Sequence, residues 1–183
     1  MKKYLFLFTI YFSIAITVQS QETKNYNWGV ETELLAWRIG KFPKSFYLGG
    51  WYGQNHFKFS LATGYFDLVP NHLPDSFIND KTFILNLKCD YFFNEQYKNF
   101  WVGPSLLFEN VNMISEENYS SEISYFSLGF STGFLFLIKN IVYIGPSLQI
   151  HFPLGKHKYI ISPDRFYYVP WSFEPGLRLG VKF

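Results

Sequence analysis

Apolar and polar residues alternate through most of this chain, and the alternation is clearest at its end. In residues 173–183 every odd-numbered residue is apolar, and the residues between them are small or charged. Successive side chains of a β-strand point to opposite sides. The segment therefore predicts a strand with one apolar face and one small or charged face.

The same alternation, interrupted by turn residues, predicts strands along the whole chain. They are expected at residues 28–39, 46–53, 56–68, 81–93, 100–110, 122–138, 141–152 and 168–183. Most reach the roughly 9–11 residues that a tilted strand needs to cross a bilayer. Short and long connections alternate from the second strand onward, as in barrels with short periplasmic turns and longer outer loops. The pattern predicts an all-β fold, an eight-stranded antiparallel up-and-down transmembrane barrel.

The residues on the two faces indicate which side is outside. In segment 122–138, Phe126, Leu128 and Phe130 alternate with Ser127 and Gly129. A continuous apolar face suits lipid, and small residues suit a narrow lumen. A soluble barrel would place the apolar face inside, so a soluble periplasmic β-barrel is one alternative. Aromatic residues near the strand ends favour the membrane interpretation.

Composition agrees with a membrane protein. Aromatic residues make up 22% of the chain and charged residues 16%, whereas soluble domains carry about 25% charged residues. The single cysteine, Cys89, excludes an internal disulfide. The net charge of +2 is small, and no Lys/Arg cluster indicates nucleic-acid binding.

The N-terminus has the features of a secretory signal. Lys2 and Lys3 precede an uncharged, mostly apolar run of 15 residues, which is followed by Val18-Gln19-Ser20. The run is shorter than the roughly 20 residues of a membrane-spanning helix. We therefore expect a cleaved signal peptide at 1–20 and a barrel domain at 21–183. Gln21 is not a cysteine, so no lipid anchor is implied.

These features together resemble the small eight-stranded outer-membrane β-barrel proteins of the OmpA-domain and OmpX type. The resemblance covers residues 28–183 and implies a monomer in the outer membrane of a Gram-negative bacterium, surrounded by outer-membrane lipid. It also implies that the barrel-assembly machinery reads the apolar face of the terminal strand as an assembly signal. That face consists of Leu177, Leu179, Val181 and Phe183.

Charged residues on the small-residue faces are expected to point into the lumen. An eight-stranded barrel is only wide enough inside for side chains, and unpaired charges there would be costly. We therefore expect an internal network of ion pairs, with a selective pore as the alternative. The residues are Glu31, Glu33, Lys58, Lys88, Asp90, Glu109, Glu174, Arg178 and Lys182.

Catalytic chemistry has weaker support. Ser147 and His151 share a face, and Glu109 or Glu174 would complete a Ser/His/acid set typical of a lipid hydrolase. Residues four apart in a strand are about 13 Å apart, too far for a direct hydrogen bond. We therefore expect no catalytic or metal site and no cofactor. The expected role is structural or surface-binding through the outer loops, with a narrow channel or a lipid-modifying enzyme as alternatives.

A short internal repeat remains. Gly103-Pro104-Ser105-Leu106 recurs as Gly145-Pro146-Ser147-Leu148, and both copies fall on strands that run in the same direction. Proline removes a ladder hydrogen bond. The repeat therefore predicts a kink or bulge at the same height in two strands.

Overall fold

The computed structural model describes residues 28–35, 44–68, 77–138 and 141–183. The predicted signal segment lies outside these residues. Within the described ranges no helix is long and apolar enough to span a membrane. The strands are β1 (Trp28–Glu33), β2 (Phe46–Gln54), β3 (Phe57–Asp67), β4 (Phe77–Phe92), β5 (Asn99–Ser115), β6 (Ser120–Ile138), β7 (Val142–Pro153), β8 (Lys158–Ser162), β9 (Arg165–Tyr168) and β10 (Ser172–Lys182).

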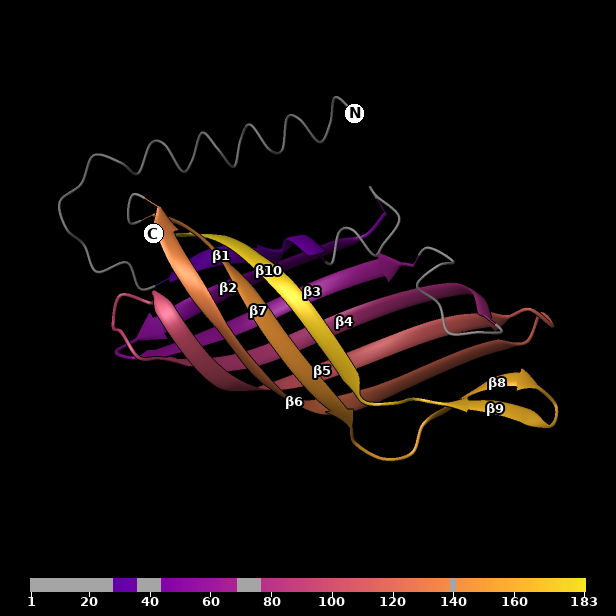
Figure 1. Ribbon diagram of the computed structural model, residues 1–183. Helices are drawn as coiled ribbons and strands as arrows, with labels where there is room; N and C mark the ends of the chain where they lie inside the picture. Colours follow the sequence, from indigo (N-terminus) through magenta and orange to yellow (C-terminus); the bar gives the residue numbers. More distant parts are fainter. Residues whose placement is uncertain (1–27, 36–43, 69–76, 139–140) are drawn as a thin grey trace, which may run out of the picture.

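Eight of these strands form a closed antiparallel barrel in the order β1-β10-β7-β6-β5-β4-β3-β2, and β8 pairs with β9 in a separate hairpin (Figure 1). The barrel closes between its first and last strands, where Val30 lies opposite Val181. The amide of Phe183 also donates to the carbonyl of Trp28 over 2.8 Å. The predicted fold class is confirmed.

The two faces of the barrel wall differ as predicted. In β6, Leu128 points outward and is 52% exposed, whereas Ser127 points inward and is 1% exposed. Across the wall, outward positions are mostly apolar, and the buried positions include most of the charged side chains of the strands. The barrel therefore has a mostly apolar outer face and holds most of its charged side chains within, unlike a soluble barrel, whose charges lie outside.

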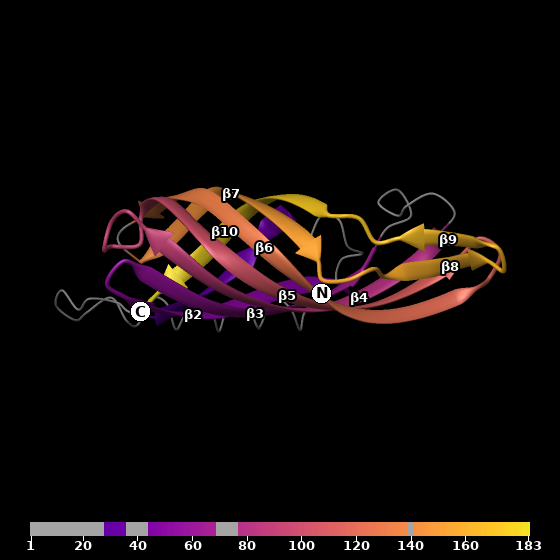
Figure 2. The same cartoon turned by 90° about the horizontal axis from the view of Figure 1, so that it is seen from below.

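The strands at one end of the barrel extend further than the sequence predicts. β4 begins at Phe77 rather than residue 81, β5 runs to Ser115, and β6 starts at Ser120, so the expected loop 111–121 is mostly strand. The expected loop 153–167 contains β8 and most of β9, and β10 begins only at Ser172. Figure 2 shows the β8–β9 hairpin beside this extension, at the end of the barrel opposite Phe183.

A polar outer surface explains why the sequence pattern misses this extension. Asn110 of β5 points outward and donates through Nδ2 to Ser124 Oγ over 2.8 Å and to Glu122 Oε1 over 3.3 Å. Inward positions such as Val111 and Met113 remain buried. The ladder continues although its outer face has become polar, so the apolar alternation weakens before the strand ends.

The Gly-Pro-Ser-Leu repeat interrupts the ladder without shifting its register. Between β4 and β5 pairing stops at Lys88–Ser105 and resumes at Tyr91–Val102, on either side of Pro104. Between β6 and β7 it stops at Gly133–Ser147 and resumes at Phe136–Ile144, on either side of Pro146. The expected kink is thus an interruption without a bulge. The glycine before each proline permits close approach of the neighbouring strand, since a Cβ on Gly145 would lie 1.7 Å from the Phe134 carbonyl oxygen.

Gly145→Ala should therefore destabilise the barrel by about 1–3 kcal/mol or more, because the added methyl group forces β6 and β7 apart. Gly50→Ala is the matched control, since a Cβ there meets no atom nearer than 4.0 Å. Its effect should stay within about 0.5 kcal/mol. Urea unfolding in detergent measures both. Equal stability of the two variants would contradict the close approach at Gly145.

Candidate functional site

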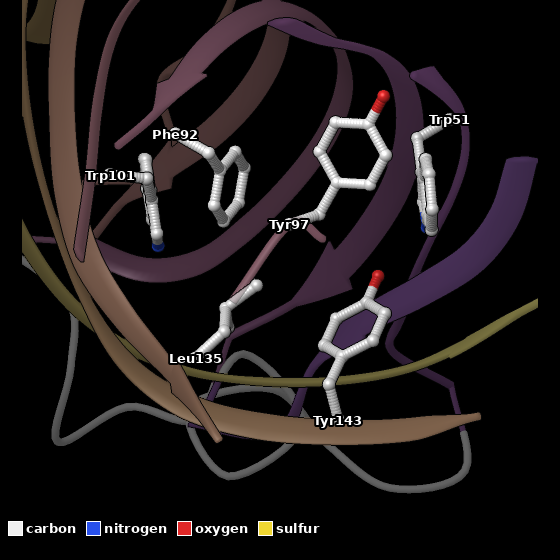
Figure 3. Close-up of a cluster of buried hydrophobic side chains, with 6 residues drawn as sticks. All are labelled: Trp51, Phe92, Tyr97, Trp101, Leu135 and Tyr143. Atoms are coloured by element: carbon white, nitrogen blue, oxygen red, sulfur yellow. The ribbon is translucent and has the colours of Figure 1, made fainter. Parts of the chain in front are cut away.

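The lumen is closed near the short-turn end by a cluster of large side chains. They come from opposite parts of the wall and point toward one another (Figure 3). Tyr97 enters this cluster from the turn between β4 and β5, and burial raises the pKa of its phenol. The cluster leaves little space for an aqueous path. Its members are Trp51, Phe92, Tyr97, Trp101, Leu135 and Tyr143.

Arg178 of β10 connects this cluster to the buried charges. Its Nε donates to Glu33 Oε1 over 3.1 Å, and its Nη1 donates to Asp90 Oδ2 over 2.7 Å. The guanidinium carbon lies 3.9 Å from the centre of the Trp101 ring. The side chain is completely buried. One cation thus links β1, β4, β5 and β10 across the lumen.

Glu31 forms a second centre in the same network. It forms a buried ion pair with Lys58, and its Oε1 lies 3.7 Å from Lys88 Nζ. The Tyr143 hydroxyl donates to Glu31 Oε2 over 2.8 Å. The Lys58 ammonium also lies 5.3 Å from the centre of the Trp51 ring. Neutral donors and aromatic faces therefore supplement the ion pairs, as buried charges require.

The structure brings six of the nine expected lumen charges into this network: Glu31, Glu33, Lys58, Lys88, Asp90 and Arg178. Three are acidic and three are basic, so the network is formally neutral. Lys182 lies nearer the turns and donates to the Gln96 carbonyl over 3.2 Å. Glu109 and Glu174 stand apart, nearer the other end of the barrel, and belong to a different part of the lumen.

Ser147 and His151 have different hydrogen-bond partners, as their spacing in the strand predicts. Ser147 donates to Glu33 Oε1 over 3.2 Å. His151 Nε2 lies 3.2 Å from Ser105 Oγ, and His151 Nδ1 lies 3.4 Å from Glu174 Oε1. The structure thus contains a Ser–His–Glu chain that includes Ser105 of the Gly-Pro-Ser-Leu repeat in place of Ser147.

Gly129 is the reason that Ser105 and His151 meet. It lies opposite Ser105 on one side and opposite His151 on the other. A Cβ on Gly129 would lie 2.3 Å from Ser105 Oγ and 2.2 Å from His151 Cδ2. Side chains from the two flanking strands therefore join across a position with no side chain. The strand register, together with this inward glycine, is the signal that would have identified the pair.

The described side chains do not fill the other half of the lumen. It contains a cavity of about 680 Å³ between the charge network and the β8–β9 hairpin, lined by residues that include Glu33, Asp80, Glu109, Glu174 and Tyr159. No three His, Cys, Asp or Glu side chains of the described ranges lie close enough to hold a metal ion. The lumen is therefore a cup, closed at the short-turn end and hollow toward the hairpin.

The expected assembly segment lies at the seam of the barrel. Leu177, Leu179 and Val181 occupy the outward face of β10, opposite Pro146, Ile144 and Val142 of β7. The ring of Phe183 packs 4.7 Å from that of Trp28. These side chains form a continuous, partly exposed apolar face at the closing strand.

No protein-family model matches the chain, and neither does any curated protein sequence. Two solved structures share its architecture. One is the N-terminal β-barrel domain of Pseudomonas aeruginosa OprF, with a TM-score of 0.55 and 13% identity, covering 86% of this chain and 98% of that one. The other is Neisserial surface protein A, NspA, with a TM-score of 0.57 and 14% identity, covering 89% of this chain and 100% of that one. At the level of fold, the predicted resemblance to small eight-stranded outer-membrane barrels is confirmed.

Proposed function

We propose that the chain is an integral outer-membrane protein of a Gram-negative bacterium, with a structural or surface-binding role at its outer end. The apolar outer face supports insertion in lipid, and the closed lumen supports an anchor rather than a conduit. The observation that carries the binding role is the projection at the end of the barrel opposite Phe183. It consists of the extended β5 and β6 strands and the β8–β9 hairpin.

The hairpin is fixed to the barrel by specific contacts. The Ile160 amide donates to Ser121 Oγ over 2.8 Å, and Ser115 Oγ donates to the Ile161 carbonyl over 3.0 Å. The ring of Tyr159 packs edge-on against Phe77. A hairpin held in one position presents its free face without a large ordering cost on binding.

The free face of the hairpin combines apolar and basic groups. Ile160, Phe166 and Tyr168 are exposed, and the Lys158 ammonium lies 3.7 Å from the centre of the Phe166 ring. Aromatic side chains are enriched at binding interfaces. The surface supports contact with a partner at the cell exterior.

Substituting both Ile160 and Phe166 by serine should abolish the surface-binding role and leave the barrel folded, because both side chains are exposed. The test compares a deletion strain complemented with the normal chain, with this variant, or with a control carrying Ile138→Ser in the apolar belt. Cell adhesion to a surface and envelope permeability to a large antibiotic are measured. If only cells with the hairpin variant lose adhesion, the result supports surface binding. If the deletion strain becomes permeable and the hairpin variant restores the barrier, the result supports a structural role. No change in either property on deletion would contradict the proposal.

The channel alternative predicts conductance in planar bilayers. The closed end argues against it, because six large side chains meet across the lumen. We expect no discrete current steps from the purified barrel.

The hydrolase alternative has one specific observation in its favour, the Ser105–His151–Glu174 chain. Ser105 and His151 are both buried, and neither lines the lumen cavity. Ser105 borders instead a depression that is lined by outward-facing leucines such as Leu87 and Leu106. A nucleophile needs space for the reacting carbonyl. Lipid mass analysis of cells with the normal chain and with Ser105→Ala tests this alternative, and we expect identical lipids.

Export and assembly complete the proposal. The mature protein recovered from membranes should begin at Gln21, which mass spectrometry of the intact chain measures. A chain that still starts at Met1 would contradict the predicted signal peptide. We also propose that the seam face ending at Phe183 is read by the barrel-assembly machinery, so deletion of Phe183 should lower surface abundance more than it lowers refolding in detergent.

A further inference from the structure

The cavity in the hollow half of the lumen has the dimensions of a ligand site. Its volume is about 680 Å³, within the roughly 300–1,000 Å³ typical of small-molecule pockets. Much of its wall is apolar, including Phe66, Leu107, Val111 and Met113. Such a wall favours a ligand with an apolar body.

The polar part of the wall is acidic. Of the described residues that line the cavity, four carry carboxylates, and none is Lys, Arg or His. Glu33 is compensated by Arg178, and Glu174 contacts His151. Asp80 and Glu109 form no ion pair with any described residue. Their partners are hydroxyl groups, with Thr82 Oγ1 2.6 Å from Asp80 and Ser127 Oγ 3.5 Å from Glu109. Asp80 is buried and Glu109 is partly buried. Carboxylates removed from water without a cationic partner are costly, so the cavity favours a positive ligand.

Three further polar atoms in the same wall are independent of the carboxylates. Tyr47 Oη, Asn86 Oδ1 and Gln149 Oε1 are buried and have no hydrogen-bond partner among the described residues. All three residues line the cavity. Buried polar groups are nearly always hydrogen-bonded in folded proteins. Two of these atoms are amide oxygens, which accept hydrogen bonds only, so they call for a donor.

The carboxylates are spread around the wall rather than gathered at one point. No three of the described acidic or histidine side chains are close enough to coordinate one metal ion. An ion held by clustered oxygen ligands therefore does not fit, whereas an elongated organic cation reaches acceptors at separate points and covers the apolar wall between them. The cluster of large side chains lies beneath the cavity, between it and the short turns.

We propose that this cavity binds a small organic ammonium ion with an apolar portion, such as an alkylamine. The ammonium group donates to Asp80 or Glu109 and to the free amide oxygens, and the carbon chain packs on Leu107, Val111 and Met113. This site is distinct from the surface of the hairpin. Its occupancy does not depend on the proposed surface-binding role.

The test uses a methionine reporter. The chain has only two methionines, Met1 in the predicted signal segment and Met113 in the cavity wall. Full-length mature protein labelled with ¹³C at the methionine methyl is refolded in zwitterionic micelles and titrated with hexylamine, hexanol or hexanoate. We expect a saturable shift of the Met113 methyl resonance with hexylamine, binding at least tenfold weaker for hexanol, and no saturable shift with hexanoate.

Glu109→Gln and Asp80→Asn should each weaken hexylamine binding on the order of tenfold, because each removes one charge-assisted hydrogen bond. Glu122→Gln is the control, since it changes the same charge on the outer face of β6. The titrations of the unaltered chain with the three ligands test the proposal even if a variant does not fold. The proposal would be overturned by equal shifts from hexylamine and hexanol, by a saturable shift from hexanoate, or by no shift from any probe. It would also be overturned if the cavity variants bound hexylamine as well as the control does.

Discussion

Arg178→Ala should lower the free energy of unfolding by about 3–5 kcal/mol, because it removes one member of a buried charge network and leaves the others uncompensated. Glu33 and Asp90 would each lose their charged donor, and both are buried. The stacking of the guanidinium on Trp101 would also be lost.

Arg165→Ala is the matched control, since Arg165 is exposed and its carboxylate partner Glu117 is 3.9 Å away at the surface. Exposed ion pairs contribute about 0–1 kcal/mol. Urea unfolding of both variants in the same detergent gives the comparison. If Arg178→Ala lowers the free energy of unfolding no more than Arg165→Ala does, the lumen charges are not a structural network. A triple variant that also replaces Glu33 and Asp90 by neutral residues should recover part of the loss, because it removes the uncompensated charges as well.

The second large effect is expected on the opposite side of the wall. Leu87→Arg should cost roughly 2–4 kcal/mol in lipid, the cost of an arginine on the lipid face near the bilayer centre. Leu87 points outward from the middle of β4 and lies opposite Leu61 and Leu106 of the flanking strands. The substitution therefore places a charge in the middle of the apolar belt.

Ser124→Arg adds the same charge to an outward, exposed position of the β6 extension. Outside the hydrocarbon the cost should fall to about 0–1 kcal/mol. Unfolding of both variants in lipid vesicles measures the difference. Similar losses in lipid, or a Leu87→Arg variant as stable as the normal chain, would mean that the apolar face does not contact hydrocarbon.

The barrel was predictable because a lipid environment imposes one simple pattern. Outward residues such as Leu128 must be apolar, and inward residues such as Ser127 must fit a narrow lumen. Alternation with a period of two residues therefore predicts both where the strands lie and which of their faces points outward. Six of the expected lumen charges meet in one network because the lumen of an eight-stranded barrel is narrow enough for side chains from different strands to contact one another.

The remaining features depend on relations that the pattern does not contain. The extension of β5 has polar residues at the outward positions Asn110 and Asn112, so the apolar alternation is lost there and the strand resembles a loop in sequence. The contact of Ser105 with His151 depends on the register of three strands and on Gly129 between them. The cavity depends on which inward side chains leave space, a property of packing rather than of alternation.

In an apolar-out membrane barrel, β6 has its even-numbered side chains in lipid and its odd-numbered side chains in the lumen. Single cysteines introduced at 126, 128, 130, 127 and 131, in a Cys89→Ser background, can be labelled with a small fluorophore in lipid vesicles. A quencher attached to the lipid chains then reports contact with hydrocarbon. We expect strong quenching at 126, 128 and 130 and little at 127 and 131. Strong quenching at 127 and 131 with little at the even positions, or no alternation at all, would contradict the apolar-out membrane barrel.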